Sequence, residues 1–175
     1  MDGVVKITDF GLARYHGALN RKLTQGVVTR WYRAPEICLG ATYYGESVDI
    51  WSLGCILAEL YLKTPLFKGE TDIDQMSKIF GIRGTPTEEN WPDARTLPFY
   101  LKFTFEPRNP IDLGQIIPNA PEPVLELIDG MLQLDPGRRF TWEQIMANEF
   151  MRQTVEVSEV DFVAGLQKFK NAEIN

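Results

Sequence analysis

The stretch that decides the fold is Ser47-Val-Asp-Ile-Trp-Ser-Leu-Gly-Cys-Ile-Leu-Ala-Glu-Leu-Tyr-Leu62. Its apolar side chains cover most of the circumference of a helix: Ile50, Trp51, Leu53, Cys55, Ile56, Leu57 and Leu60. A helix that is apolar on nearly all sides is buried in the centre of a domain. The sequence therefore predicts a central helix over 47–62, capped by Ser47 and ended by Pro65.

Two further helices are predicted from capping signals. Thr71 is followed three residues later by an aspartate, and this capping-box spacing predicts a helix over 71–82. Thr141 is followed at the same spacing by Gln144, which predicts a helix over 141–150.

The other segments carry weaker signals. Apolar residues recur at helical spacing over 122–134 and over 158–169. Seven of the 11 prolines lie in 85–121, so this connection is predicted to be mostly irregular, with a short helical turn at 87–91. β-branched residues in 3–8 predict one short N-terminal strand or hairpin. The predicted fold class is therefore mainly α.

The composition is that of an ordinary globular chain. Of its 175 residues, 44% are hydrophobic and 24% are charged, which is enough for one core. The net charge of −6 argues against nucleic-acid binding as a main role, and no apolar run reaches the roughly 20 residues of a membrane span. Two cysteines and one histidine exclude a disulfide framework and argue against a zinc site. We therefore expect an intracellular protein.

The charge is distributed unevenly along the chain. Residues 6–33 contain six basic residues and one acid, Asp9, whereas the other 147 residues contain 12 basic and 23 acidic residues. A basic stretch in an acidic chain either meets a local anion or is a solvated loop. Charge alone leaves both interpretations open.

Three motifs follow one another from this basic stretch into the central helix. They are Asp9-Phe-Gly11, Thr29-Arg-Trp-Tyr-Arg-Ala-Pro-Glu36 and Val48-Asp-Ile-Trp-Ser-Leu-Gly-Cys55. One such motif arises by chance, but three in this order at these spacings are specific. On these residues the chain resembles the C-terminal lobe of a eukaryotic protein kinase, without the β-rich N-lobe. The resemblance implies a partial kinase domain over 1–152 and a C-terminal tail over 153–175.

Further stretches are similar to one subgroup of the cyclin-dependent kinases, the one that activates other cyclin-dependent kinases and serves the transcription machinery. These stretches are Gly40-Ala41 with Tyr44-Gly45, Cys55-Ile-Leu-Ala-Glu-Leu60, Asp72-Ile-Asp-Gln75 and Gly84-Thr-Pro-Thr-Glu-Glu-Asn-Trp-Pro-Asp93. The resemblance implies a proline-directed Ser/Thr kinase of the cell cycle and transcription, using ATP and Mg²⁺. Its implied partners are a cyclin and protein substrates, not nucleic acid or a membrane, in the nucleus and/or cytoplasm.

Carried over to this sequence, the resemblance assigns roles in the activation segment. Asp9 would ligate Mg²⁺ and so contribute to cofactor binding, because a hard cation prefers carboxylate oxygen. The alternative for Asp9 is a turn aspartate. Thr24 would be the phosphorylated residue, and Arg14 would hold its phosphate.

The resemblance also assigns roles to residues in and near the second and third motifs. Val27, Val28 and Arg33 match the surface that prefers a proline after the target residue, although plain packing also explains the two valines. Thr29 would support the catalytic aspartate and lysine. Two structural roles complete the set: a buried ion pair between Glu36 and Arg139, and backbone N–H groups of the catalytic loop donating to Asp49.

Several kinase parts do not occur in these 175 residues. They contain no Gly-rich loop, no strand lysine with its helix glutamate, and no His-Arg-Asp catalytic loop with its catalytic aspartate. We therefore expect this chain alone to be inactive, and the helix over 47–62 to expose apolar surface. Two hypotheses follow: part of a working kinase, or a non-catalytic decoy for a cyclin or substrate. A decayed kinase gene is a third.

Overall fold

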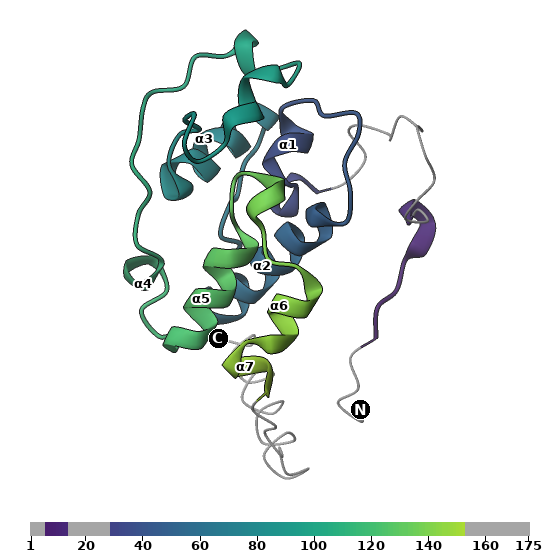
Figure 1. Cartoon of the computed structure of the whole chain (residues 1–175), viewed down its shortest axis with the longest axis vertical. Helices are drawn as coiled ribbons and strands as arrows, with labels where there is room; N and C mark the ends of the chain where they lie inside the picture. The colour runs from purple at the N-terminus through teal and green to yellow at the C-terminus, as the bar shows by residue number, and fades with distance from the viewer. Residues whose placement is uncertain (1–5, 14–28, 153–175) are drawn as a thin grey trace, which may run out of the picture. The chain divides into compact units, whose positions relative to one another are not determined.

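The computed structural model describes residues 6–13 and 29–152, which belong to two separate units. Within 29–152, helices joined by turns and irregular segments form the whole structure (Figure 1). The α-helices are α1 (Pro35–Cys38), α2 (Ser47–Leu62), α3 (Asp72–Arg83), α4 (Leu113–Ile116), α5 (Glu122–Met131), α6 (Trp142–Ala147) and α7 (Glu149–Arg152). The described residues contain no β-strand, and this confirms the mainly α fold class.

Helix α2 lies at the centre of residues 29–152 and packs against α5. Its inner face is buried through Ile50, Trp51, Cys55 and Ala58, and the Trp51 ring stacks on Phe67 with ring centroids 5.7 Å apart. Gly54 allows the close approach of the two helices, because a Cβ there would lie 2.9 Å from side-chain atoms of Met131 and Leu132. The bounds of α2 agree with the predicted helix over 47–62.

The predicted cap of α2 is wrong. Glu46, not Ser47, occupies the N-cap position, and its side chain makes no capping hydrogen bond. Ser47 is the first residue of the helix and follows the N-cap position. A side chain accepts a free N–H group of the first turn from the N-cap position, so Ser47 is one residue too late to cap the helix. At the other end Lys63 adopts φ 62° and its N–H donates to the Glu59 carbonyl, which ends the helix before Pro65.

The caps predicted for α3 and α6 are present. The Thr71 hydroxyl accepts the Asp74 N–H at 3.1 Å, and α3 runs one residue past the predicted end. Thr141 and Gln144 form both bonds of the capping box. The helix predicted over 141–150 is divided at Asn148, whose side-chain oxygen accepts the Phe150 N–H at 2.8 Å and starts α7.

The remaining expectations meet mixed outcomes. α5 ends at Met131, before the predicted 134. Within 85–121, residues 87–91 form the predicted single turn, closed by the Trp91 N–H, which donates to the Thr87 carbonyl at 3.0 Å. The 3₁₀ helix Pro92–Thr96 follows it directly. Lys6 to Asp9 are not a strand, and residues 3–5 lie outside the described residues, as does the helix predicted over 158–169.

One face of α2 exposes apolar side chains, as expected. Ile56 is 47% exposed and Leu60, one turn further on, is 60% exposed. Within residues 6–13 and 29–152, no helix combines the length and apolar character that crossing a membrane requires.

Candidate functional site

The motif over 29–36 forms a short surface segment that leads into α1. Thr29 is exposed, and Arg30–Tyr32 form a 3₁₀ helix directly after it. The Thr29 hydroxyl makes no hydrogen bond within the part of the chain that the structure describes. Pro35 then begins α1, where its fixed φ favours a first helical residue.

Trp31 connects this segment to the start of α3. Its indole N–H donates to the Gly69 carbonyl at 3.2 Å, and the Lys68 ammonium lies 5.2 Å from its ring centroid. Gln75 completes the connection. Its side-chain N–H donates to the Trp31 carbonyl at 3.3 Å, while its side-chain oxygen accepts the Gly69 N–H at 2.9 Å. Gln75 is fully buried, so both bonds are sheltered from water.

Tyr32 connects the same segment to α2. Its hydroxyl donates to Glu59 at 2.7 Å, and its carbonyl accepts the Ser52 hydroxyl at 2.9 Å. The hydrogen bond to the Glu59 carboxylate, together with burial, raises the pKa of Tyr32 to about 12. The segment is therefore bonded to α2 on one side and to α3 on the other.

Arg33, which the resemblance assigns to the proline-binding surface, pairs with the first residue of α3. Its guanidinium lies 3.0 Å from the Asp72 carboxylate, and Arg30 donates to the same oxygen at 3.1 Å. The side chain of Arg33 is only 10% exposed, whereas those of Arg30 and Asp72 are about half exposed. One carboxylate thus orients two guanidinium groups, and the cluster keeps a net positive charge.

Glu36 and Arg139 form a buried bidentate ion pair. Two parallel bonds join the guanidinium to the carboxylate, at 2.7 and 2.6 Å. The side chains are 5% and 0% exposed, and the guanidinium lies 5.0 Å from the Trp51 ring. The other N–H groups of the guanidinium donate to three main-chain carbonyl oxygens, those of Ser47, Gln133 and Leu134. The end of the 29–36 segment is therefore tied to α2 and to the chain after α5.

Asp49 lies on the first turn of α2, but it is exposed. Its carboxylate makes no hydrogen bond within residues 6–13 and 29–152. Partial desolvation raises its pKa, and the nearby charge of Glu46 adds to this. Asp49 therefore remains a predicted acceptor that has no donor among the described residues.

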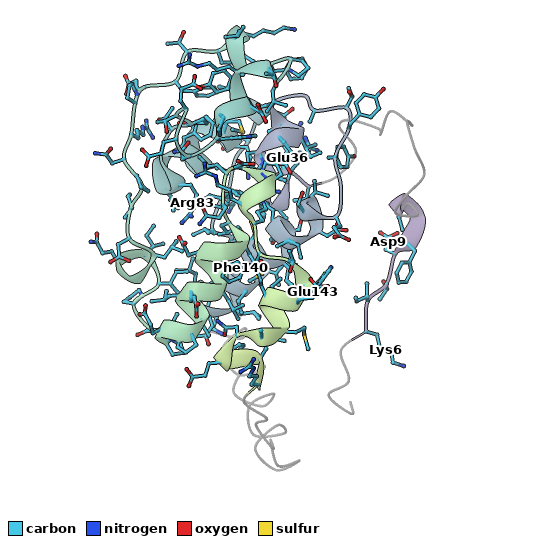
Figure 2. All side chains as sticks on the ribbon, viewed as in Figure 1. Lys6, Asp9, Glu36, Arg83, Phe140 and Glu143 are labelled. Carbon is cyan, nitrogen blue, oxygen red and sulfur yellow. The ribbon has the colours of Figure 1, made fainter. Side chains whose placement is uncertain are left out.

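Asp9 lies in the other unit, ahead of the 3₁₀ helix Phe10–Leu12 (Figure 2). Its backbone is left-handed, with φ 60° and ψ 63°, a conformation that aspartate tolerates better than most residues. The carboxylate does not cap the 3₁₀ helix. One carboxylate of this kind fits Mg²⁺ bound mainly through phosphates and water, and no cluster of three or more metal-binding side chains occurs in the described ranges.

Four residues assigned by the resemblance lie outside the described residues: Arg14, Thr24, Val27 and Val28. Their roles stay predictions. Two residues that hold the 29–36 segment had no assigned role in the sequence, namely Asp72 and Gln75. Asp72 and Gln75 belong to the quoted stretch Asp72-Ile-Asp-Gln75, but their partners lie more than 35 residues earlier in the chain.

Comparisons with known proteins show the family of the chain. Residues 1–151 match the protein kinase domain. Cyclin-dependent kinase 7 of Caenorhabditis elegans is 48% identical over 151 residues, which cover 86% of this chain and 45% of that protein. The proteins of that name from Xenopus laevis and Carassius auratus are each 46% identical, over 85% and 83% of this chain and 42% of their own lengths. The chain spans less than half the length of these relatives. It belongs to the protein kinase family, in the branch of the cyclin-dependent kinases.

Proposed function

We propose that this chain supplies the substrate-binding half of a Ser/Thr kinase that transfers the γ-phosphate of ATP to residues followed by proline. The observation that carries this proposal is the double anchoring of the 29–36 segment. Trp31 and Arg33 are bonded to the start of α3, and Glu36 to Arg139. Phosphoryl transfer depends mainly on positioning, so the surface that receives a peptide must be held rigidly.

Arg33 is the described member of the proposed proline-binding surface. Its side chain is 90% covered and held by Asp72, so it acts as a wall of the surface more than as a free charge. A substrate proline has no N–H, whereas any other residue would bring an N–H that stays unpaired on burial. Val27 and Val28 would supply the apolar part of this surface.

Regulation and cofactor binding belong to the activation segment. A phosphate on Thr24 would add a charge of about −2 that Arg14 is suited to hold. Asp9 would ligate the Mg²⁺ that neutralises the nucleotide phosphates in the transfer. In the same proposal a cyclin and protein substrates are the partners, in the nucleus and/or the cytoplasm.

The chain by itself is proposed to be catalytically inactive. Its 175 residues contain none of the groups that cover the phosphates or that accept the proton of the substrate hydroxyl. Asp9 alone does not position a nucleotide.

The test measures both parts of this proposal on the purified chain. Phosphate transfer from radiolabelled ATP to a Ser-Pro peptide should not exceed that of the Asp9→Asn variant. In nuclear magnetic resonance spectra, the Ser-Pro peptide should shift resonances of Arg30 to Arg33 more than a matched Ser-Ala peptide does. Transfer that Asp9→Asn abolishes would overturn the inactivity, and equal shifts from both peptides would overturn the proline-binding surface.

A second candidate function is a non-catalytic decoy that binds a cyclin or a substrate protein. The exposed Ile56 and Leu60 on α2 favour it, because exposed apolar pairs mark interaction surfaces. A cyclin immobilised on beads should then retain the chain and release the Ile56→Asp variant. Failure of the immobilised cyclin and substrate proteins to retain the chain would exclude the decoy without bearing on the kinase assignment.

A further inference from the structure

Arg30 has hydrogen-bonding groups that no other described residue uses. Its Nε–H donates to the Asp72 carboxylate at 3.1 Å, and the side chain is 46% exposed. The two Nη groups make no hydrogen bond or ion pair among the described residues. The two Nη groups of a guanidinium form an edge that binds a carboxylate or a phosphate through two parallel bonds. Arg30 therefore presents an edge that is suited to an anion.

Asp72 holds the rest of the Arg30 guanidinium in position. The same carboxylate oxygen accepts a hydrogen bond from Arg33 at 3.0 Å, so the two guanidinium groups are close neighbours. A side chain that is already oriented loses less conformational entropy when it binds a ligand. The Nη edge of Arg30 is therefore prepared for binding by the fold itself.

The charged groups around this edge leave a surplus of positive charge. Glu36 is neutralised by its buried ion pair, and Asp74 is neutralised by Lys78, 3.6 Å away. The remaining charged residues of 29–36 and of 68–74 are three cations and two acids, namely Arg30, Arg33, Lys68, Glu70 and Asp72. A local surplus of one positive charge favours an anion over a cation as the ligand.

The proposed proline-binding surface lies beside this edge, because Arg33 belongs to that surface and shares its acceptor with Arg30. In an extended peptide, successive side chains point to opposite faces, and side chains two positions apart share a face. Two substrate positions therefore share the face of the proline: the residue directly before the target Ser or Thr, and the second residue after the proline. A side chain at one of these positions can contact the Nη edge.

We propose that Arg30 is a specificity-determining residue that selects substrates with an anionic side chain, a carboxylate or a phosphate, at one of these two positions. The anion binds across both Nη groups while Asp72 keeps the guanidinium in place. The position of the anion relative to the target residue rests on the proposed function, whereas the contact with Arg30 does not.

The test titrates the ¹⁵N-labelled full chain with blocked Ser-Pro peptides and obtains dissociation constants from the shifts of the Arg30 to Arg33 amides. One peptide has Glu directly before the Ser, and another has Glu at the second residue after the proline. One of the two should bind about 2- to 5-fold more tightly than the same peptide with Gln, as expected for a partly exposed charge pair. Glu at the first residue after the proline should give no gain, because it faces the other way. Phosphoserine in place of the favoured Glu then shows which of the two anions binds more tightly.

A charge reversal separates a direct contact from a structural role. Arg30→Glu should reverse the selection, so that a peptide with Lys at the favoured position binds more tightly than the peptide with Glu. A purely structural role of Arg30 does not give this reversal. The fold should tolerate the change, because Arg30 is half exposed and Asp72 keeps its bond to Arg33.

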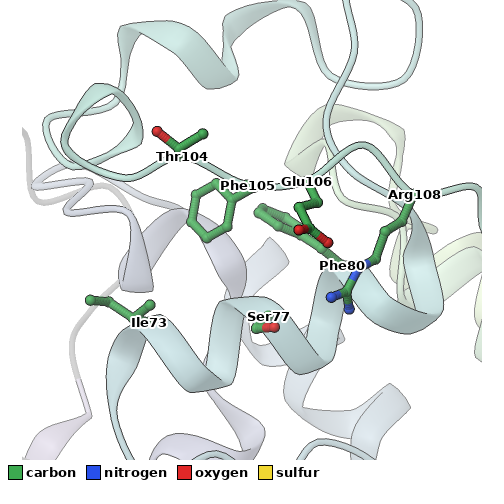
Figure 3. Close-up of a pocket in the computed structure, with 7 residues that line it drawn as sticks. All are labelled: Ile73, Ser77, Phe80, Thr104, Phe105, Glu106 and Arg108. Carbon is green, nitrogen blue, oxygen red and sulfur yellow. The ribbon is translucent and has the colours of Figure 1, made fainter.

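The matched control pair is Arg30→Gln and Arg108→Gln, which change the net charge equally. Arg108 is exposed and makes no ion pair in the described ranges. It lines a pocket between α3 and residues 104–108, and none of the residues that line this pocket belongs to the 29–36 segment (Figure 3). Arg30→Gln should remove the preference for Glu, and Arg108→Gln should leave it unchanged.

Two results would overturn the proposal: no gain from Glu at either position, or a gain that Arg30→Gln leaves intact. Both differ from a failure of the proposed function, which is equal binding of Ser-Pro and Ser-Ala peptides. Measuring the Glu gain in Ser-Ala peptides as well keeps the two apart. A gain without any preference for proline would remove the proline-binding surface and keep the Arg30 contact.

Discussion

Two charge clusters hold the ends of the 29–36 segment, and they differ in almost every physical respect. At one end the Glu36–Arg139 pair is buried, bidentate and fully hydrogen-bonded. At the other, Asp72 binds Arg30 and Arg33 from a side chain that is 51% exposed. The buried pair specifies one arrangement and does not tolerate the loss of a partner, whereas water screens the exposed cluster. The two ends of the segment are therefore held by ion pairs of different strength.

The largest effect is expected from breaking the buried pair. Arg139→Ala leaves the Glu36 carboxylate buried without a partner, which should lower the free energy of unfolding by about 3–5 kcal/mol in denaturant titrations. The double variant Glu36→Leu/Arg139→Met should lose much less, because it leaves no unpaired charge. A double variant as unstable as Arg139→Ala would show that the other contacts of Arg139, its packing against Trp51 and its three main-chain hydrogen bonds, contribute more than the charge pairing.

The second largest effect is expected at Gln75, the buried amide that joins Trp31 to Gly69. Gln75→Leu keeps a similar volume but leaves the Gly69 N–H and the Trp31 carbonyl unpaired, which should cost about 1–3 kcal/mol of unfolding free energy. Trp31 fluorescence should then report a looser segment. A loss below that of an ordinary surface substitution would indicate that water replaces both bonds.

A smaller effect is expected at the exposed cluster. Asp72→Asn should cost only about 0.2–1 kcal/mol, and high salt should remove most of the difference. Glu88→Gln is the matched control, since it breaks the exposed pair with Arg95, away from the segment. A loss at Asp72 that persists in high salt would mean that this cluster fixes the segment as firmly as Glu36 does.

The smallest expected effect on the free energy of unfolding comes from Tyr32 and is confined to alkaline pH. The hydrogen bond to Glu59, together with burial, raises the pKa of Tyr32 from about 10 to about 12. The Tyr32 hydroxyl therefore loses its proton at a lower pH in the unfolded chain than in the folded chain. Its contribution to stability is fully present below pH 10 and is lost as the pH rises toward 12. Tyr32→Phe should show a shallower decline of unfolding free energy over that range, whereas Tyr43→Phe, at an exposed tyrosine, should decline like the wild type.

Local sequence patterns predicted where the helices lie better than they predicted the residues at which the helices begin and end. The apolar pattern over 47–62 and the capping spacings at Thr71 and Thr141 involve residues at most a few turns apart, so the sequence displays them directly. The cap of α2 and the division at Asn148 were missed, because they depend on which side chain reaches a free N–H group.

The site was predictable only in part. The motifs identified the family and named Arg33, Glu36 and Arg139 through resemblance. Asp72 and Gln75 had no assigned role, because their contribution comes from partners 39 to 44 residues earlier in the chain.

The sequence by itself determined the family, the mainly α class and the position of the central helix, because helices depend on contacts between residues three and four apart. Only the tertiary structure decided which charges are paired and which are buried. Residues 36 and 139 are 103 positions apart, and the strength of their pairing depends on the exclusion of water by the packed core around Trp51.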